Sequence, residues 1–210
     1  MALLFSTSGF LALLAGYLLG SIPFGLVLTK AAGLGDIRQM GSGNIGATNV
    51  LRTGHRGLAA ATLLLDGLKG VVAVLIVDDI ARRLSSADAV SYIYIYGYIA
   101  GLGAFLGHIY PVWLRFLGGK GVATYIGVLV GVHLPAAILF GLIWTGVAAS
   151  TRYSSLAALC ATVAVVIYYF VTGWAGLPFI LIMSVLIFLK HHANIRRLLE
   201  GRETKIGGRS

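Results

Sequence analysis

Residues 121–150 read GVATYIGVLVGVHLPAAILFGLIWTGVAAS and contain no Asp, Glu, Lys or Arg. A helix needs about 20 apolar residues to cross a hydrocarbon core of about 30 Å, so this stretch is too long for one crossing and too continuous for a loop. His133, Leu134 and Pro135 divide it, because proline has no backbone N–H and restricts the residue before it. The stretch therefore predicts two membrane helices joined by a tight turn.

The rest of the chain has the same apolar character. Of its 210 residues, 58% are hydrophobic and 11% are charged, and the mean hydropathy is +0.91, whereas a soluble domain is about 25% charged. No linker, low-complexity segment or internal repeat interrupts the pattern. These features predict an all-α polytopic membrane protein with about seven transmembrane helices, in one integral-membrane domain covering residues 1–210. The other apolar stretches lie near residues 3–29, 57–77, 89–110, 155–172 and 175–190.

The net charge of +9 comes mainly from loops between apolar stretches. With seven crossings these loops all fall on one side, which the positive-inside rule makes cytoplasmic. We therefore expect the N-terminus outside and the C-terminus in the cytoplasm, a multi-pass location in the cell membrane with the bilayer as partner, and no binding of nucleic acid. On the other side, VDDIARRLSSAD at 77–88 balances Arg82 and Arg83 with Asp78, Asp79 and Asp88. The basic loop and tail residues are Lys30, Arg38, Arg52, Arg56, Arg115, Lys120, Arg152, Lys190, Arg196, Arg197, Arg202, Lys205 and Arg209.

Residues 41–46, GSGNIG, match the glycine pattern of dinucleotide-binding loops. That interpretation needs a preceding strand and an acidic residue on the ribose, but the segment upstream is GLGDIRQM and the next acid, Asp66, lies inside an apolar helix. A Walker A loop is excluded as well, because Gly121 follows Lys120 where Ser or Thr is required. The sequence thus argues against a nucleotide site.

The glycines of this loop still favour an anion site, because they let backbone N–H groups converge on a phosphate. The second loop, GGKG at 118–121, places Lys120 between glycines and lies on the same predicted side. Two such loops would suit two phosphorylated substrates; the alternative is two tight turns with anchoring charges. In the first loop Arg52 has the forked charge that suits phosphate. The candidate phosphate-binding residues are Gly41, Ser42, Gly43, Asn44, Gly46, Thr48, Asn49, Arg52, Gly119, Lys120 and Gly121.

Two histidines fall at predicted cytoplasmic helix ends: His108 beside GGKG, and His191 three residues before Asn194. Each is a candidate proton acceptor, or alternatively an interfacial or capping residue. Asp66 and Lys69 share one helical face, either as an ion pair that makes burial tolerable or as a functional pair. No cluster of cysteines and carboxylates suggests a metal, and we expect no metal and no cofactor.

Covalent catalysis has little support in this chain. It contains no G-x-S-x-G motif. The H-x-x-x-x-D motif, carried by glycerolipid acyltransferases that use a histidine base supported by an aspartate, is also missing. The residues five positions after the histidines are Ala60, Trp113, Ile138, Arg196 and Arg197.

Taken in order, five stretches of this chain resemble one family, the acyl-phosphate-dependent glycerol-3-phosphate acyltransferases of bacterial membranes, or PlsY family. The resemblance covers almost the whole chain and adds Arg152, Ser154 and Asn194 to the phosphate-binding candidates. The chain departs from many members at Leu117, where they carry a basic residue before the GGKG loop. The five stretches are GSIPFG at 20–25, GSGNIGATNVLR at 41–52, GHIYPVWLRFLGGKGVAT at 107–124, RYSSLA at 152–157 and HHANIRRLLEGRE at 191–203.

The resemblance implies transfer of a fatty acyl group from acyl phosphate to the 1-hydroxyl of sn-glycerol 3-phosphate, giving lysophosphatidate and inorganic phosphate. It implies a seven-helix acyltransferase domain in the bacterial inner membrane, with the active site at the cytoplasmic face. Acyl-carrier protein and acyl-coenzyme A are then not the direct donors, and the enzyme that supplies acyl phosphate becomes a candidate partner.

An acyl phosphate is already activated, so the protein need only orient two phosphorylated molecules and stabilise charge. We expect Lys120, Arg52, Ser42, His191 and His108 to act in catalysis. The base is left open between His191, His108 and a substrate phosphate oxygen; we favour the phosphate, because neither histidine has a visible carboxylate partner. Which loop holds the donor is also open. The alternative functions are a transporter or flippase for an organic phosphate, and a structural membrane protein.

Overall fold

The computed structural model describes residues 5–84 and 90–207, and within these ranges the chain forms helices and loops without strands. Asp88 and Arg209, counted above among the loop charges, lie outside the described residues. In chain order the elements are α1 (Thr7–Gly20), α2 (Phe24–Ala31), η2 (Ile37–Gln39), α3 (Ala47–Leu51), α4 (Arg56–Leu84), α5 (Val90–Ile109), η4 (Val112–Leu114), α6 (Val122–Val132), α7 (Leu134–Thr151), α8 (Ser154–Thr172), α9 (Leu177–Lys190) and α10 (His192–Leu199).

The break expected in residues 121–150 is present at His133. Its extended backbone (φ −161°, ψ 83°) ends α6, while its N–H still donates to Leu129 O at 2.7 Å. Pro135 then occupies the first turn of α7, where a missing N–H costs nothing. One local signal thus sets both helix ends.

Two other helices differ from their expected bounds. The first apolar stretch is two helices, because the chain breaks between Gly20 and Phe24, around Pro23. In the other direction α4 continues to Leu84, through residues 77–84 that we expected in a loop. No glycine or proline interrupts it there, and Arg83 Nε donates to Asp79 Oδ2 at 2.7 Å one turn earlier.

Small residues let the helices approach one another closely. Gly103 of α5 lies against α1, where an added Cβ would stand 2.2 Å from Leu13 O. Gly127 of α6 meets α4 in the same way, 1.9 Å from Gly67 O. Such contacts are typical of helix packing in membranes. Large side chains, with Phe105, Tyr125 and Phe140 fully buried, fill the centre of the bundle.

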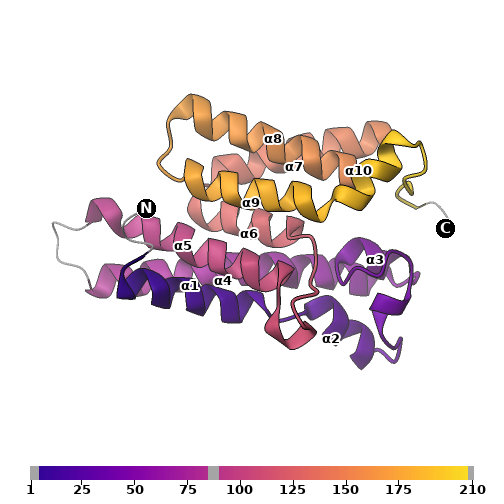
Figure 1. Ribbon diagram of the computed structural model, residues 1–210, viewed down its shortest axis with the longest axis horizontal. Helices are drawn as coiled ribbons and strands as arrows, with labels where there is room; N and C mark the ends of the chain where they lie inside the picture. The colour runs from indigo at the N-terminus through magenta and orange to yellow at the C-terminus, as the bar shows by residue number, and fades with distance from the viewer. Residues whose placement is uncertain (1–4, 85–89, 208–210) are drawn as a thin grey trace.

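The segments that carry the predicted site residues gather at one end of the bundle. Figure 1 shows α2, α3 and α10 at one end of the bundle, opposite the connection between α8 and α9. The junction of α9 and α10 bends by 58° there.

Within the described residues, four segments are long and apolar enough to cross a membrane, and a fifth results if α9 and α10 form one bent span. They are Thr7–Ala31, Arg56–Leu84, Leu134–Thr151 and Ser154–Thr172, with Leu177–Lys190 plus His192–Leu199 as the bent pair.

Candidate functional site

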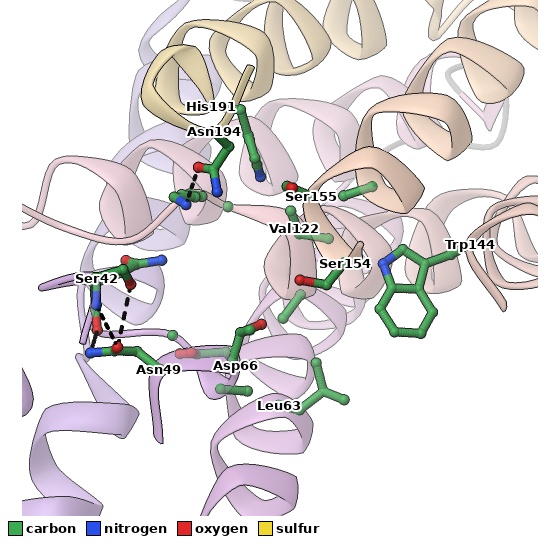
Figure 2. A pocket seen from close by; sticks show the side chains of 18 of the residues that line it. Ser42, Asn49, Leu63, Asp66, Val122, Trp144, Ser154, Ser155, His191 and Asn194 are labelled. Carbon is green, nitrogen blue, oxygen red and sulfur yellow. Dashed lines mark hydrogen bonds between the residues drawn. The ribbon is translucent and has the colours of Figure 1, made fainter. Parts of the chain in front are cut away.

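A pocket of about 210 Å³ opens at this end of the bundle. Figure 2 shows Ser42 and Asn49 on one side of it, His191 and Asn194 across from them, and Trp144 with Leu63 beside Ser154. Chain segments far apart in sequence therefore supply its walls. The sequence-predicted residues that line it are Ser42, Asn44, Gly46, Thr48, Asn49, Arg52, Asp66, His108, Lys120, Gly121, Ser154, His191 and Asn194.

Four other candidates do not line the pocket: Gly41, Gly43, Gly119 and Arg152. Gly41 and Gly43 adopt positive φ angles of 52° and 70°, so they shape the turn that carries Ser42. Arg152 also has a positive φ, and its Nη2 donates to Ile206 O at 2.9 Å, which ties the C-terminal segment to the start of α8. The structure thus gives Gly41, Gly43 and Arg152 supporting positions.

Asn49 organises the first loop. Its Nδ2 lies within 3.0 Å of three carbonyl oxygens, those of Ile37, Met40 and Asn44. Its Oδ1 accepts from the backbone N–H of Ser42 at 3.0 Å, and Arg52 Nη1 lies 3.4 Å away. Because these contacts occupy the buried amide, Asn49 positions Ser42 and Arg52 and has no free group for a ligand.

A polar chain connects the second loop to the C-terminal segment. Lys120 Nζ donates to Asn194 Oδ1, and Asn194 Nδ2 donates to Glu203 Oε1 at 2.6 Å. Glu203 also accepts from Ser155 Oγ at 2.8 Å and from Arg197 Nε at 2.7 Å. Burial alone would raise the pKa of Glu203, but these hydrogen bonds lower it. Glu203 therefore stays ionised and fixes Asn194 beside Lys120.

Lys120 lies in the loop before α6, and its surroundings lower the pKa of its ammonium group. Burial lowers its pKa to about 8; Glu203 acts to raise it, while the charges of Arg197 and Arg52 lower it further. A bound phosphate would favour the ammonium, because an opposite charge stabilises the protonated form. The site is thus cationic and prepared for an anion.

The two histidines of the site have different partners at Nδ1. His191 lies in the bend between α9 and α10, and its Nδ1 is 2.8 Å from Ile187 O, to which it donates. Its Nε2 is then the acceptor, and Figure 2 shows the ring directed into the pocket. His108 Nδ1 instead lies 2.8 Å from Lys69 Nζ, inside the bundle. The two rings therefore do not offer the same chemistry.

One side of the pocket is apolar. Leu63 of α4, Ile126 of α6, Trp144 of α7 and Ala158 of α8 line it. Leu63 is half exposed on the surface of the bundle, so this wall continues toward the lipid-facing side. The pocket can therefore hold an anionic group and an alkyl chain together.

Sequence reasoning missed several pocket residues, chiefly Glu203, Ser155 and Thr204. Glu203 stands in the quoted stretch HHANIRRLLEGRE, but its contacts come from residues nine and 48 positions away, which no local pattern shows. In residues 5–84 and 90–207 no group of three or more His, Cys, Asp or Glu side chains comes together as a metal site would need.

Apolar spanning helices with a cationic pocket at one end define an integral membrane protein with a site for polar chemistry. Residues 10–201 match the family model described as "Glycerol-3-phosphate acyltransferase". A protein named glycerol-3-phosphate acyltransferase from Mesorhizobium japonicum is 59% identical, over 95% of this chain and 96% of its own length. A protein of the same name from Brucella anthropi is 54% identical, over 94% of this chain and 93% of its own length.

Two crystal structures of PlsY, an integral membrane glycerol 3-phosphate acyltransferase, are also similar. The glycerol 3-phosphate form has a TM-score of 0.83 at 38% identity, and the lysophosphatidic acid form has 0.81 at 37%. Each comparison covers 94% of this chain and 95% of the other. The chain therefore belongs to the glycerol-3-phosphate acyltransferase family, which confirms the expected family and makes it an acyltransferase.

Proposed function

We propose that this pocket transfers a fatty acyl group from acyl phosphate to the 1-hydroxyl of sn-glycerol 3-phosphate, giving lysophosphatidate and inorganic phosphate. One observation carries the proposal. Lys120, Arg52, Ser42 and His191 come from segments far apart in sequence and line one pocket whose opposite wall is apolar. Family membership and the substrate and product forms of the related PlsY structures support this assignment.

In this site the cations bind phosphate and the apolar wall receives the acyl chain. Lys120 and Arg52 lie on different loops, and Asn49 and Asn194 hold them in place. Gly121, Val122 and Ala123 at the start of α6 also line the pocket, where free N–H groups at a helix N-terminus favour an anion. Holding two phosphorylated molecules in one geometry supplies much of the rate enhancement.

The reaction needs no covalent acyl-enzyme. The 1-oxygen of glycerol 3-phosphate attacks the acyl carbonyl carbon, the bond from that carbon to the phosphate oxygen breaks, and the hydroxyl proton ends on the released phosphate. Lys120 and neighbouring donors stabilise the negative charge on the carbonyl oxygen. A substrate phosphate oxygen accepts the proton; His191 Nε2 is the alternative acceptor.

We further propose one domain over residues 1–210 with seven crossings, counting α5 and α6 with the five segments above. The excess of basic loop residues supports a cytoplasmic face for the pocket end of the bundle. The N-terminus is then outside, the C-terminus inside, and the protein lies in the bacterial inner membrane. The enzyme that makes acyl phosphate delivers the donor at that face.

The deciding assay uses the purified full chain in detergent with acyl phosphate and labelled glycerol 3-phosphate. We expect labelled lysophosphatidate from the wild type and from Cys160→Ala, a residue of α8 outside the pocket lining. Lys120→Ala should lower kcat/KM by about 100-fold or more, because a charged group is lost from a buried site. Glycerol 3-phosphate uptake by proteoliposomes without lysophosphatidate would establish the transporter instead.

A further inference from the structure

Lys69, on α4 beneath the pocket, has its ammonium surrounded by acceptors. Nζ lies 2.8 Å from Asp66 Oδ1, 2.8 Å from His108 Nδ1 and 3.0 Å from Ile22 O. Its N–H groups hydrogen-bond to His108 Nδ1 and Ile22 O, whereas Asp66 Oδ1 is its ion-pair partner and makes no hydrogen bond with a described residue. All three side chains are buried, with 2% to 4% of their surface exposed. Asp66 and Lys69 therefore form a neutral pair, and one N–H group of the ammonium is directed at the imidazole of His108.

This contact determines which ring nitrogen of His108 carries hydrogen. Asp66 Oδ1 is 3.6 Å from Nδ1, beyond a good hydrogen bond, so Lys69 is the near partner. With the proton on Lys69, Nδ1 accepts and the neutral ring has its hydrogen on Nε2. If the proton moved from Lys69 to Nδ1, the ring would be an imidazolium, with hydrogen on both nitrogens. In both arrangements Nε2 bears a hydrogen.

Nε2 of His108 is directed at the GGKG loop. A Cβ added to Gly119 would stand 2.1 Å from this atom, so the ring edge lies directly against that glycine. The backbone N–H of Gly119 also donates to His108 O at 3.0 Å, which holds the loop over the ring. His108 lines the pocket next to Lys120, and Nε2 makes no hydrogen bond with another described residue.

From these contacts we propose that His108 Nε2–H is a fixed hydrogen-bond donor to a substrate phosphate oxygen, and that Lys69 and Asp66 are positioning residues that orient it. Nε2 has no lone pair for a proton, so His108 is not the general base. Because the trio carries no net charge, it supplies a donor deep in the site without adding an uncompensated ion. This role rests on the proposed function, and either substrate supplies the phosphate oxygen.

Two amide variants of His108 test the donor. His108→Asn keeps an acceptor for Lys69 near the Nδ1 position but removes the group at Nε2, whereas His108→Gln places an amide N–H near Nε2. We expect His108→Asn to raise the KM of one phosphorylated substrate about tenfold, the loss for one hydrogen bond to a charged group. His108→Gln should stay within about threefold of the wild type. Separate titrations of acyl phosphate and glycerol 3-phosphate identify which phosphate is bound.

Two outcomes would overturn this role. A wild-type KM and kcat in His108→Asn would mean that Nε2–H touches no substrate. Collapse of kcat in both variants would assign His108 as the base. If the wild type itself forms no lysophosphatidate, the proposed function fails first, so the two failures are distinguishable.

The positioning role of Lys69 has a direct readout. In protein labelled with ¹⁵N-histidine, the signals lost in His108→Asn identify His108, and we expect hydrogen on Nε2 at neutral pH. The double variant Asp66→Asn/Lys69→Met removes the ion pair without leaving a single buried charge. It should shift His108 to a mixture of tautomers and raise the same KM. An unprotonated Nε2 in the wild type, or an unchanged tautomer in the double variant, would contradict the assignment.

Discussion

At the residue scale, the pocket contains two histidines whose hydrogens sit on opposite ring nitrogens. His191 donates through Nδ1 to Ile187 O and offers an acceptor at Nε2, while His108 accepts at Nδ1 from Lys69 and offers a donor at Nε2. A second partner fixes the tautomer in each case. Of the two, only His191 can therefore accept a proton from the attacking hydroxyl.

Lys120 makes the activity dependent on pH. Burial lowers its pKa to about 8, so the free enzyme loses this charge as pH rises through that value. We expect kcat/KM to fall about tenfold for each pH unit above about 8. Lys120→Arg keeps its charge throughout and should lose this fall, even if its absolute rate is lower. A pH profile of kcat/KM for both proteins checks this, and an identical fall in Lys120→Arg would assign the titration elsewhere.

Residue types were easier to predict from sequence than their contacts. Glycine, amide and basic residues at 41–52 and 118–121 indicated phosphate, and the pocket contains most of them. The sequence did not show that the amide of Asn49 hydrogen-bonds to backbone carbonyls of its own loop, or that Glu203 orients Asn194. Those contacts join residues from separate turns and helices, and residue type alone does not reveal the partner.

At the element scale, glycines decide how closely α1 and α5 approach. Gly103 has a backbone oxygen of α1 where a Cβ would be, whereas Gly141 of α7 has nothing within 4 Å. We expect Gly103→Ala to lower Tm by several degrees, because one helix must move. Gly141→Ala should leave Tm unchanged or raise it, since alanine favours a helix by about 1 kcal/mol. Thermal unfolding of both in one detergent makes the comparison; equal Tm values would show that the contact is not tight.

The helix ends followed local rules where the signal was strong. Pro135 divided residues 121–150 as predicted. Residues 77–84, which carry four charges, nevertheless continue α4. The ion pair between Arg83 and Asp79 joins side chains one helical turn apart and therefore stabilises the helix.

At the scale of the whole molecule, the proposed topology predicts which charges face which compartment. In a Cys160→Ala background, which removes the only cysteine, Arg82→Cys at the end of α4 and Arg202→Cys after α10 report opposite faces. A membrane-impermeant thiol reagent should label Arg82→Cys in intact spheroplasts and label Arg202→Cys only after lysis. The reverse pattern would invert the topology, and labelling of both before lysis would contradict the crossing number.

The sequence by itself determined that the apolar helices lie in a membrane, approximately where each of them falls along the chain, and which chemical groups the site contains. Hydropathy is a sum over neighbouring residues, so it is readable from short windows. Only the tertiary structure decided which atoms meet: Lys120 with Asn194, Lys69 with His108, and Glu203 with Ser155. A hydrogen bond depends on a few tenths of an ångström between groups brought together by the packing of helices, and no local pattern contains that distance.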